Sequence, residues 1–190
     1  MPCSHAGELV LFERFYRAAA AVNTLLFIGM AVYVWFRYVG LPYAVAYDFG
    51  VGGLPEIGPK TRLITPLAVI TAAAGFTTSL LTVFSLKRHE LVERYPYLIN
   101  LPAIALILGK LPQDRARQYI DRLFIPLPIV AAALAALMAF TSYLILESAE
   151  QRRLVVDESL LVAAVLSFAV GAGVGTVLYF RKIYLQLKNT

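Results

Sequence analysis

The stretch that decides the fold is KRHELVERYPYLINLPAIALILGKLPQDRARQYIDR, residues Lys87–Arg122. It holds seven of the seventeen lysine and arginine residues of this 190-residue chain, and a long run without any charged residue lies on either side of it. Lysine and arginine in the loops of membrane proteins are enriched on the cytoplasmic side. The sequence therefore predicts a membrane protein whose orientation is fixed by this loop.

Outward from this loop, the chain contains four segments that lack Asp, Glu, Lys and Arg: residues 18–36, 63–86, 123–146 and 159–180. At about 1.5 Å per residue, a helix of each length approaches the roughly 30 Å thickness of the bilayer hydrocarbon. Only 15% of the residues are charged, against roughly a quarter in soluble domains. We expect one all-α transmembrane domain over residues 1–190, an integral membrane four-helix bundle with spans at about 18–36, 63–86, 125–146 and 159–180.

The basic residues also predict the orientation. With four spans, twelve of them fall on the two termini and the middle loop, and five fall on the other two loops. We therefore expect a multi-pass protein of the cell membrane with cytoplasmic N- and C-termini. The first run is not expected to be a cleaved signal peptide, because Glu8 and Glu13 precede it and the bulky Val34-Trp35-Phe36 ends it.

The middle loop contains two different parts. Residues 95–109 are uncharged but interrupted by Pro96 and Pro102, so we expect a segment that lies in the membrane interface without crossing it. The residues after Pro112 have the spacing of an amphipathic, interfacial helix. Its predicted apolar face carries Ala116, Tyr119, Ile120, Leu123 and Phe124, and its predicted polar face carries Asp114, Arg115, Gln118, Asp121 and Arg122. We assign Arg115, Arg117 and Arg122 to anionic lipid headgroups.

The first inter-helix loop, residues 37–62, is the best candidate for a binding site. Its core is dense in glycine and proline, which predicts tight turns and no helix. Asp48, Glu56 and Lys60 lie beside this turn-rich backbone, where they can ligate a cation or bind a peptide. The alternative is structural: the two carboxylates satisfy turn N–H groups, and Lys60 meets lipid headgroups.

The fourth span contains Gly171 and Gly175, a spacing at which another helix can approach closely. Helix packing, within the chain or in a homo-oligomer, is therefore expected there. The spans contain no ionisable residue of the kind that marks a proton or ion path. Their hydroxyl and amide side chains are expected to bond mainly to the backbone or to other helices.

Nothing in the sequence predicts an enzyme. No nucleophile motif, phosphate-binding loop or metal-ligand spacing is present, and His5 and His89 stand apart, so we expect no catalytic residue, no metal and no cofactor. The net charge of +5 does not indicate nucleic acid binding, because the basic residues lie at the ends of apolar runs. The expected partners are the lipid bilayer and its anionic headgroups, and a peptide or protein is a further candidate.

Two loops resemble a known family. Residues 41–66 contain Leu41-Pro42, Asp48-Phe49, Gly53-Leu54-Pro55-Glu56, Gly58-Pro59-Lys60 and Pro66, and the middle loop contains Tyr95-Pro96, Asn100-Leu101-Pro102 and Ala116-Arg117-Gln118-Tyr119. In order and spacing these resemble the small multi-pass domain of unknown function at the N-terminus of SdpI-type bacterial immunity proteins. Asp48 stands where that family usually has histidine, and Glu56 where it has aspartate.

The resemblance implies an integral membrane protein related to proteins that confer immunity to a secreted toxin and signal to a cytoplasmic repressor. The first functional expectation is thus a non-enzymatic immunity or signalling protein with an extracellular ligand-sensing loop. A small oligomeric transporter or channel is the second. The third is an accessory subunit of a larger membrane protein complex.

Overall fold

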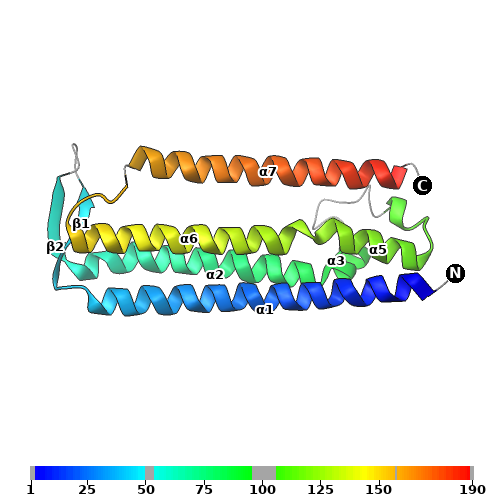
Figure 1. Ribbon diagram of the computed structural model, residues 1–190, viewed down its shortest axis with the longest axis horizontal. Helices are drawn as coiled ribbons and strands as arrows, with labels where there is room; N and C mark the ends of the chain where they lie inside the picture. The colour runs from blue at the N-terminus through cyan, green and yellow to red at the C-terminus, as the bar shows by residue number, and fades with distance from the viewer. Residues whose placement is uncertain (1–2, 50–53, 96–105, 157, 189–190) are drawn as a thin grey trace. The chain divides into compact units, whose positions relative to one another are not determined.

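The computed structural model describes residues 3–49, 54–95, 106–156 and 158–188, and these are mostly helical (Figure 1). The chain divides into two compact units, which we describe separately. Unit 1 comprises residues 1–23, 79–131 and 170–190, and unit 2 comprises residues 24–78 and 132–169. The elements are α1 (Cys3–Gly40), β1 (Ala44–Phe49), β2 (Pro55–Pro59), the 3-10 helix η1 (Lys60–Leu63), α2 (Ile64–Leu86), α3 (Arg88–Arg94), α5 (Gln113–Phe124), α6 (Pro126–Gln151) and α7 (Glu158–Lys188).

Among the described residues, three helical segments are long and apolar enough to cross a membrane. They are Val10–Gly40, Lys60–Leu86 and Gln113–Gln151, with mean hydropathies of 1.8, 1.8 and 2.4. They contain the first three predicted spans, which confirms membrane-type helices there. The fourth predicted span, 159–180, falls within α7. Its crossing of the membrane and the four-helix bundle stay predictions.

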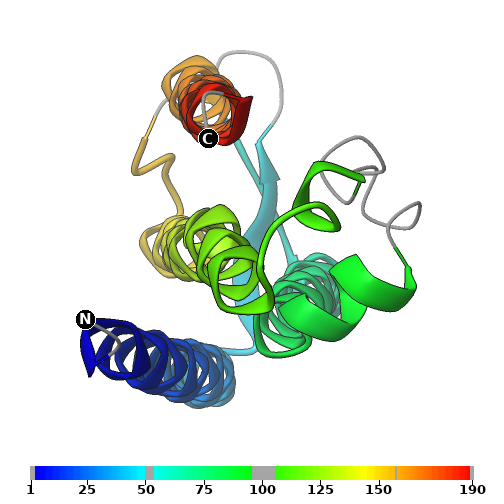
Figure 2. The same cartoon turned by 90° about the vertical axis from the view of Figure 1, so that its right-hand side faces the viewer.

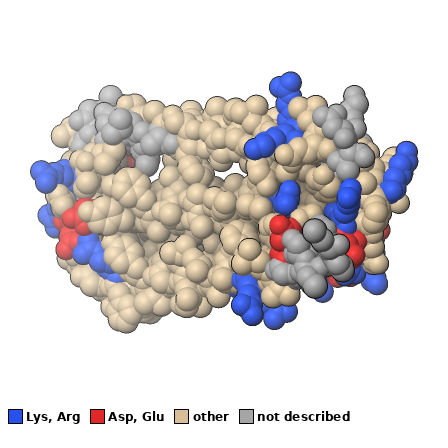
Figure 3. Space-filling view, turned by 45° about the vertical axis from the view of Figure 1, so that its right-hand side comes forward, with Lys and Arg blue, Asp and Glu red and all other residues tan. Residues whose placement is uncertain are grey.

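Large apolar side chains are exposed along these helices. Leu25 of α1, Phe76 of α2 and Val177 of α7 expose 68%, 71% and 65% of their surface. Figure 3 shows that uncharged residues cover most of the visible face and that the charged side chains on this face lie in groups. Such surfaces are unfavourable in water but favourable in lipid.

In unit 1, α3 and α5 lie against each other (Figure 2). Its core contains Tyr16 from α1, Leu91 and Val92 from α3, Leu123 from α5 and Ile183 from α7, among other residues. The predicted amphipathic helix is confirmed as α5, which buries its apolar stripe in this core. Its position in a membrane interface stays a prediction.

One prediction for α5 is wrong: Asp121 does not face away from the apolar stripe but is 1% exposed. It precedes Phe124 by three residues, so it lies at the edge of that stripe on the helix surface. Arg88 lies against it and supplies the charge that permits its burial. The predicted interfacial segment, 95–109, falls mainly on residues 96–105, which lie outside the described residues.

In unit 2, the loop after α1 forms an antiparallel hairpin, so the expectation of helices and turns alone is wrong here. The alternating Val45, Tyr47 and Phe49 favour a strand, although the neighbouring glycines and prolines dominate the composition. A register irregularity separates Ala46 from Asp48. The adjacent Val45 and Ala46 precede this irregularity and are both buried, so both faces of the strand are covered there.

The core of unit 2 joins this hairpin to the helices. Val45 packs in one cluster with Val34 of α1, Leu67 of α2 and Leu146 of α6. Within the unit, α1 and α2 approach closely at Gly75, where an added Cβ would lie 2.8 Å from Cζ of Phe27. A larger residue at Gly75 would therefore displace the Phe27 ring.

Candidate functional sites

Asp48 and Glu56, two of the three predicted ligand-binding residues, are brought together by the hairpin. They are direct partners in the register of β1 and β2, and both are exposed. We call them the carboxylate pair. Directly opposite residues of an antiparallel pair have Cβ atoms about 4.5–5.5 Å apart, and like charges there are destabilising. The hairpin thus holds two neighbouring negative charges at its surface.

Tyr47 supports one member of this pair. Its hydroxyl donates to Oε2 of Glu56 at 2.7 Å, and the guanidinium carbon of Arg62 lies 4.2 Å from its ring centroid. Because the hydrogen bond to Glu56 favours the protonated phenol, it raises the pKa of Tyr47. The ring also explains Gly58, where an added Cβ would lie 2.7 Å from Cε1 of Tyr47.

Lys60, the third predicted residue, makes structural contacts. Its Nζ lies 3.4 Å from the carbonyl oxygen of Tyr38, 3.0 Å from that of Val39 and 2.8 Å from that of Leu41. These carbonyls lie at the C-terminus of α1, where a positive charge is favourable. The three hydrogens of the ammonium group can all be used there, so Lys60, the first residue of η1 after the hairpin, fastens the end of the hairpin to the end of α1.

A pocket of about 290 Å³ lies beside the carboxylate pair in unit 2. Asp48 and Ser148 supply polar groups to its wall, and Phe49, Leu144 and Val156 are among the apolar side chains that make up most of it. We call it the hairpin pocket. Its size and lining suit one large apolar side chain with a polar or cationic neighbour at Asp48.

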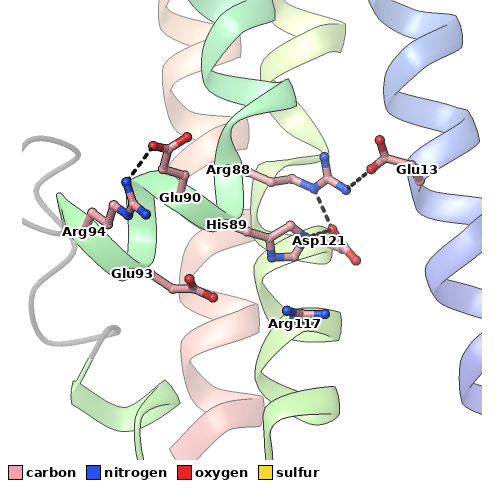
Figure 4. A pocket seen from close by; sticks show the side chains of 8 residues that line it. All are labelled: Glu13, Arg88, His89, Glu90, Glu93, Arg94, Arg117 and Asp121. Carbon is pink, nitrogen blue, oxygen red and sulfur yellow. Dashed lines mark hydrogen bonds and ion pairs between the residues drawn. The ribbon is translucent and has the colours of Figure 1, made fainter.

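Unit 1 contains a buried charge cluster that the sequence analysis missed, which we call the Arg88 cluster (Figure 4). Arg88 is 2% exposed. Its Nε donates to Oδ1 of Asp121 at 2.5 Å, its Nη1 to the carbonyl oxygen of Ser85 at 3.0 Å, and its Nη2 to Oε2 of Glu13 at 3.1 Å. The guanidinium carbon lies 3.9 Å from the ring centroid of Tyr16. Arg88 therefore joins α1, the end of α2 and α5.

Two further residues complete the cluster around Asp121. Nε2 of His89 lies 3.0 Å from Oδ1 of Asp121, and the Tyr16 hydroxyl donates to the backbone oxygen of Asp121 at 2.5 Å. Nδ1 of His89 is buried and has no hydrogen-bond partner among the described residues. Buried charges are tolerated when several groups neutralise and bond them together, and the arrangement here has that form.

A pocket of about 570 Å³ opens beside this cluster, and we call it the polar pocket. All eight described residues that line it are ionisable: Glu13, Arg88, His89, Glu90, Glu93, Arg94, Arg117 and Asp121 (Figure 4). Some are already paired, as Arg94 is with Glu90 at 3.4 Å. This pocket is suited to a small, charged ligand.

The other predicted site residues are placed as follows. Arg115 and Arg117 are exposed on α5, and Nη2 of Arg122 lies 4.0 Å from Oε2 of Glu8. No atom of the described chain lies within 4 Å of a Cβ added at Gly171 or Gly175, apart from their own helix backbone and chain neighbours. Headgroup binding by the arginines and helix packing at the glycines stay predictions.

The polar residues of the spans bond only partly as expected, because Oγ1 of Thr78 and Oγ of Ser142 are buried without a hydrogen-bond partner among the described residues. Nδ2 of Asn23 donates to the carbonyl oxygen of Pro128 at 3.2 Å, between α1 and α6 in unit 1. The hydroxyls of Thr141 and Thr176 donate to the carbonyl oxygens four residues earlier in their own helices. For these three residues the prediction of interhelical or backbone bonding is confirmed.

The fold and these sites define a mostly helical protein with membrane-type helices. No family model and no solved structure match the chain. It is similar to an uncharacterized protein of Archaeoglobus fulgidus, with 27% identity over 121 residues. The match covers 63% of this chain and 64% of the relative, which is less than two thirds of that protein's length.

Proposed function

We propose that this protein is a non-enzymatic, multi-pass membrane protein of the immunity or signalling type, whose hairpin senses an extracellular cationic ligand. The observation that supports this most directly is the carboxylate pair, since Asp48 and Glu56 are exposed and directly opposite each other. A cation placed between them relieves their repulsion, so it binds more favourably there than at a single carboxylate.

The hairpin pocket favours a peptide or protein as that ligand. Pockets for whole small molecules usually measure about 300–1,000 Å³, and this one, at about 290 Å³, lies just below that range. It accommodates one apolar side chain, while Asp48 in its wall meets a neighbouring lysine or arginine. A cationic amphipathic peptide has both groups.

The proposed orientation in the membrane rests on the distribution of the basic residues. Four crossings with cytoplasmic termini put the hairpin outside the cell and the basic middle loop inside. In this arrangement, ligand binding at the hairpin is sensed through the helices that enter and leave it. Lys60 then has a supporting role, since it fastens the hairpin to α1.

The experiment uses the full chain in lipid nanodiscs and a fluorescent peptide that alternates lysine with leucine and phenylalanine. We expect Asp48→Asn with Glu56→Gln to weaken binding by about tenfold or more, because charge-assisted bonds contribute roughly 1.5–3 kcal/mol. The matched control, Asp114→Asn with Glu90→Gln, removes one exposed and one half-buried charge from unit 1. Equal weakening by both double variants would mean that only net charge matters, and the proposal would be wrong.

A small oligomeric transporter or channel, or an accessory subunit of a larger complex, is the second candidate. The open surface at Gly171 and Gly175 favours it, because a neighbouring helix of another chain can approach there. Solute or ion flux through liposomes containing the purified chain would support a transporter. Stoichiometric co-purification of another membrane protein would support an accessory subunit.

A further inference from the structure

The polar pocket of unit 1 has a floor whose groups are already occupied. Arg88 and Asp121 are 2% and 1% exposed, and each bonds to more than one partner in the Arg88 cluster. A ligand gains little from such groups, because they would first have to give up their present partners. The floor therefore gives the pocket a fixed shape, and binding depends on the residues of its rim.

Two rim residues of opposite charge remain available. Glu93 of α3 and Arg117 of α5 are exposed, and neither makes a hydrogen bond or ion pair within the part of the chain that the structure describes. Figure 4 shows Glu93 and Arg117 on separate helices that border the same pocket. A carboxylate and a guanidinium that are not paired with each other can hold a ligand that carries both signs of charge.

The overall charge of the pocket also favours such a ligand. Four acidic and three basic residues line it together with His89, so the carboxylates outnumber the arginines by one. A simple anion would meet this excess of acidic groups. A bare metal ion is not favoured either, because no three His, Cys, Asp or Glu side chains of the described residues come together as a metal site.

The sequence positions of the pocket residues narrow the class of ligand further. Arg88 follows the end of α2 by two residues, and Asp121 precedes the uncharged run at Leu123 by two residues. Both therefore lie where predicted membrane-crossing segments end. Lipid headgroups occupy that depth, and a headgroup with an ammonium and a phosphate has both charges that Glu93 and Arg117 require.

We propose that the polar pocket binds a phosphate–ammonium zwitterion, the chemistry of a phosphoethanolamine group, with the phosphate at Arg117 and the ammonium at Glu93. Arg117 can donate two parallel N–H groups to the phosphate. The primary ammonium donates N–H groups to the Glu93 carboxylate. Phosphocholine lacks these donors, since its nitrogen carries no hydrogen, and phosphoglycerol lacks the cation.

The test measures binding of three short-chain lipids to the full chain in detergent: phosphatidylethanolamine, phosphatidylcholine and phosphatidylglycerol. We expect phosphatidylethanolamine to bind about tenfold more tightly than the other two, the effect of one charge-assisted hydrogen bond. Arg117→Gln and Glu93→Gln should each remove this preference. Arg115→Gln is the matched control, because Arg115 is exposed on the same helix but does not line the pocket.

Free phosphoethanolamine, added as a competitor, identifies the source of the zwitterion. Displacement of the lipid at similar concentration indicates a soluble ligand, and failure to displace it indicates a lipid-borne one. Either result supports the chemistry, provided that the two variants lose binding and keep the thermal stability of the parent. Equal binding of all three lipids, or a preference that survives both variants, would overturn it and leave only ordinary lipid contact.

Discussion

Asp121 of unit 1 and Asp48 of unit 2 show two different uses of an aspartate near a membrane-type helix. Asp121 is 1% exposed and is held by Arg88 and His89. Asp48 is exposed, and its Oδ1 accepts a hydrogen bond from the backbone N–H of Phe49 at 2.8 Å. The first side chain is fully committed to structure. The second is open to solvent and to a ligand, which is why we place ligand binding at the hairpin.

The difference in burial between Asp121 and Asp48 depends on the residues that contact each carboxylate. Desolvating a carboxylate and a guanidinium costs several kcal/mol per ion unless the geometry is good and the remaining atoms are bonded. In the Arg88 cluster Ser85, Glu13 and Tyr16 provide those additional contacts. At the hairpin, the residue opposite Asp48 is Glu56, another acid. Burial of Asp48 would be unfavourable, and the pair stays in solvent.

The largest effect should come from breaking the buried pair. Asp121→Ala leaves the guanidinium of Arg88 buried with only Glu13 as a carboxylate partner. Removing one member of a buried pair costs about 3–5 kcal/mol, and we expect the lower end of this range because Glu13 remains. Unfolding by denaturant in mixed micelles would measure the change in free energy.

Two further variants show whether this effect is due to charge burial. Asp114→Ala, on an exposed position of the same helix, should change stability by less than about 0.5 kcal/mol. The double variant Arg88→Met with Asp121→Leu should recover much of the loss, because well-packed apolar residues can replace a buried pair. If Asp121→Ala were as mild as Asp114→Ala, Asp121 would not be buried in the folded protein.

Sequence alone predicted the helices well because their signal is long and repetitive. Uncharged runs such as 63–86 and the apolar stripe of α5 depend on many residues, so single exceptions do not hide them. The hairpin was missed because Ala44–Phe49 is a short strand beside a stretch rich in glycine and proline. The hairpin pairs Ala44 with Pro59 and Phe49 with Pro55, and composition alone does not report which residues pair.

The candidate sites also differ in how far the sequence predicted them. Asp48 and Glu56 were found because charged residues beside glycine turns are a local signal. The Arg88 cluster was missed because its members are separated in sequence: Glu13 and Arg88 by 75 positions, and Arg88 and Asp121 by 33. Residue counting placed Arg88 among the cytoplasmic loop charges. Only the packing of α3 against α5 shows that it is buried.

An intermediate effect on stability is expected at Lys60. A structural role and a ligand-binding role for this residue predict different results on its replacement. Lys60→Met removes the ammonium group from the carbonyls at the end of α1 and should lower the free energy of unfolding by about 1–2 kcal/mol. Lys60→Arg should retain part of the stability that Lys60→Met loses. A Lys60→Met protein with parental stability but no response to the cationic peptide would instead make Lys60 a ligand-binding residue.

The smallest expected effect is a change in the pKa of Tyr47 when Glu56 or Asp48 is replaced. This change is also the sharpest test of the carboxylate pair. Its pKa is raised mainly by the hydrogen bond to Glu56, and the charge of Asp48 contributes least. Glu56→Gln should therefore lower the Tyr47 pKa more than Asp48→Asn does. Since the raised pKa holds the proton in the folded state, its contribution to stability is present below the pKa of an unfolded tyrosine and is lost as the pH rises through the folded value. Carbon NMR of labelled tyrosine, assigned with Tyr47→Phe, measures both variants. Equal shifts would show that the hairpin in solution does not hold Tyr47 on Glu56, and the register that makes the carboxylate pair would be in error.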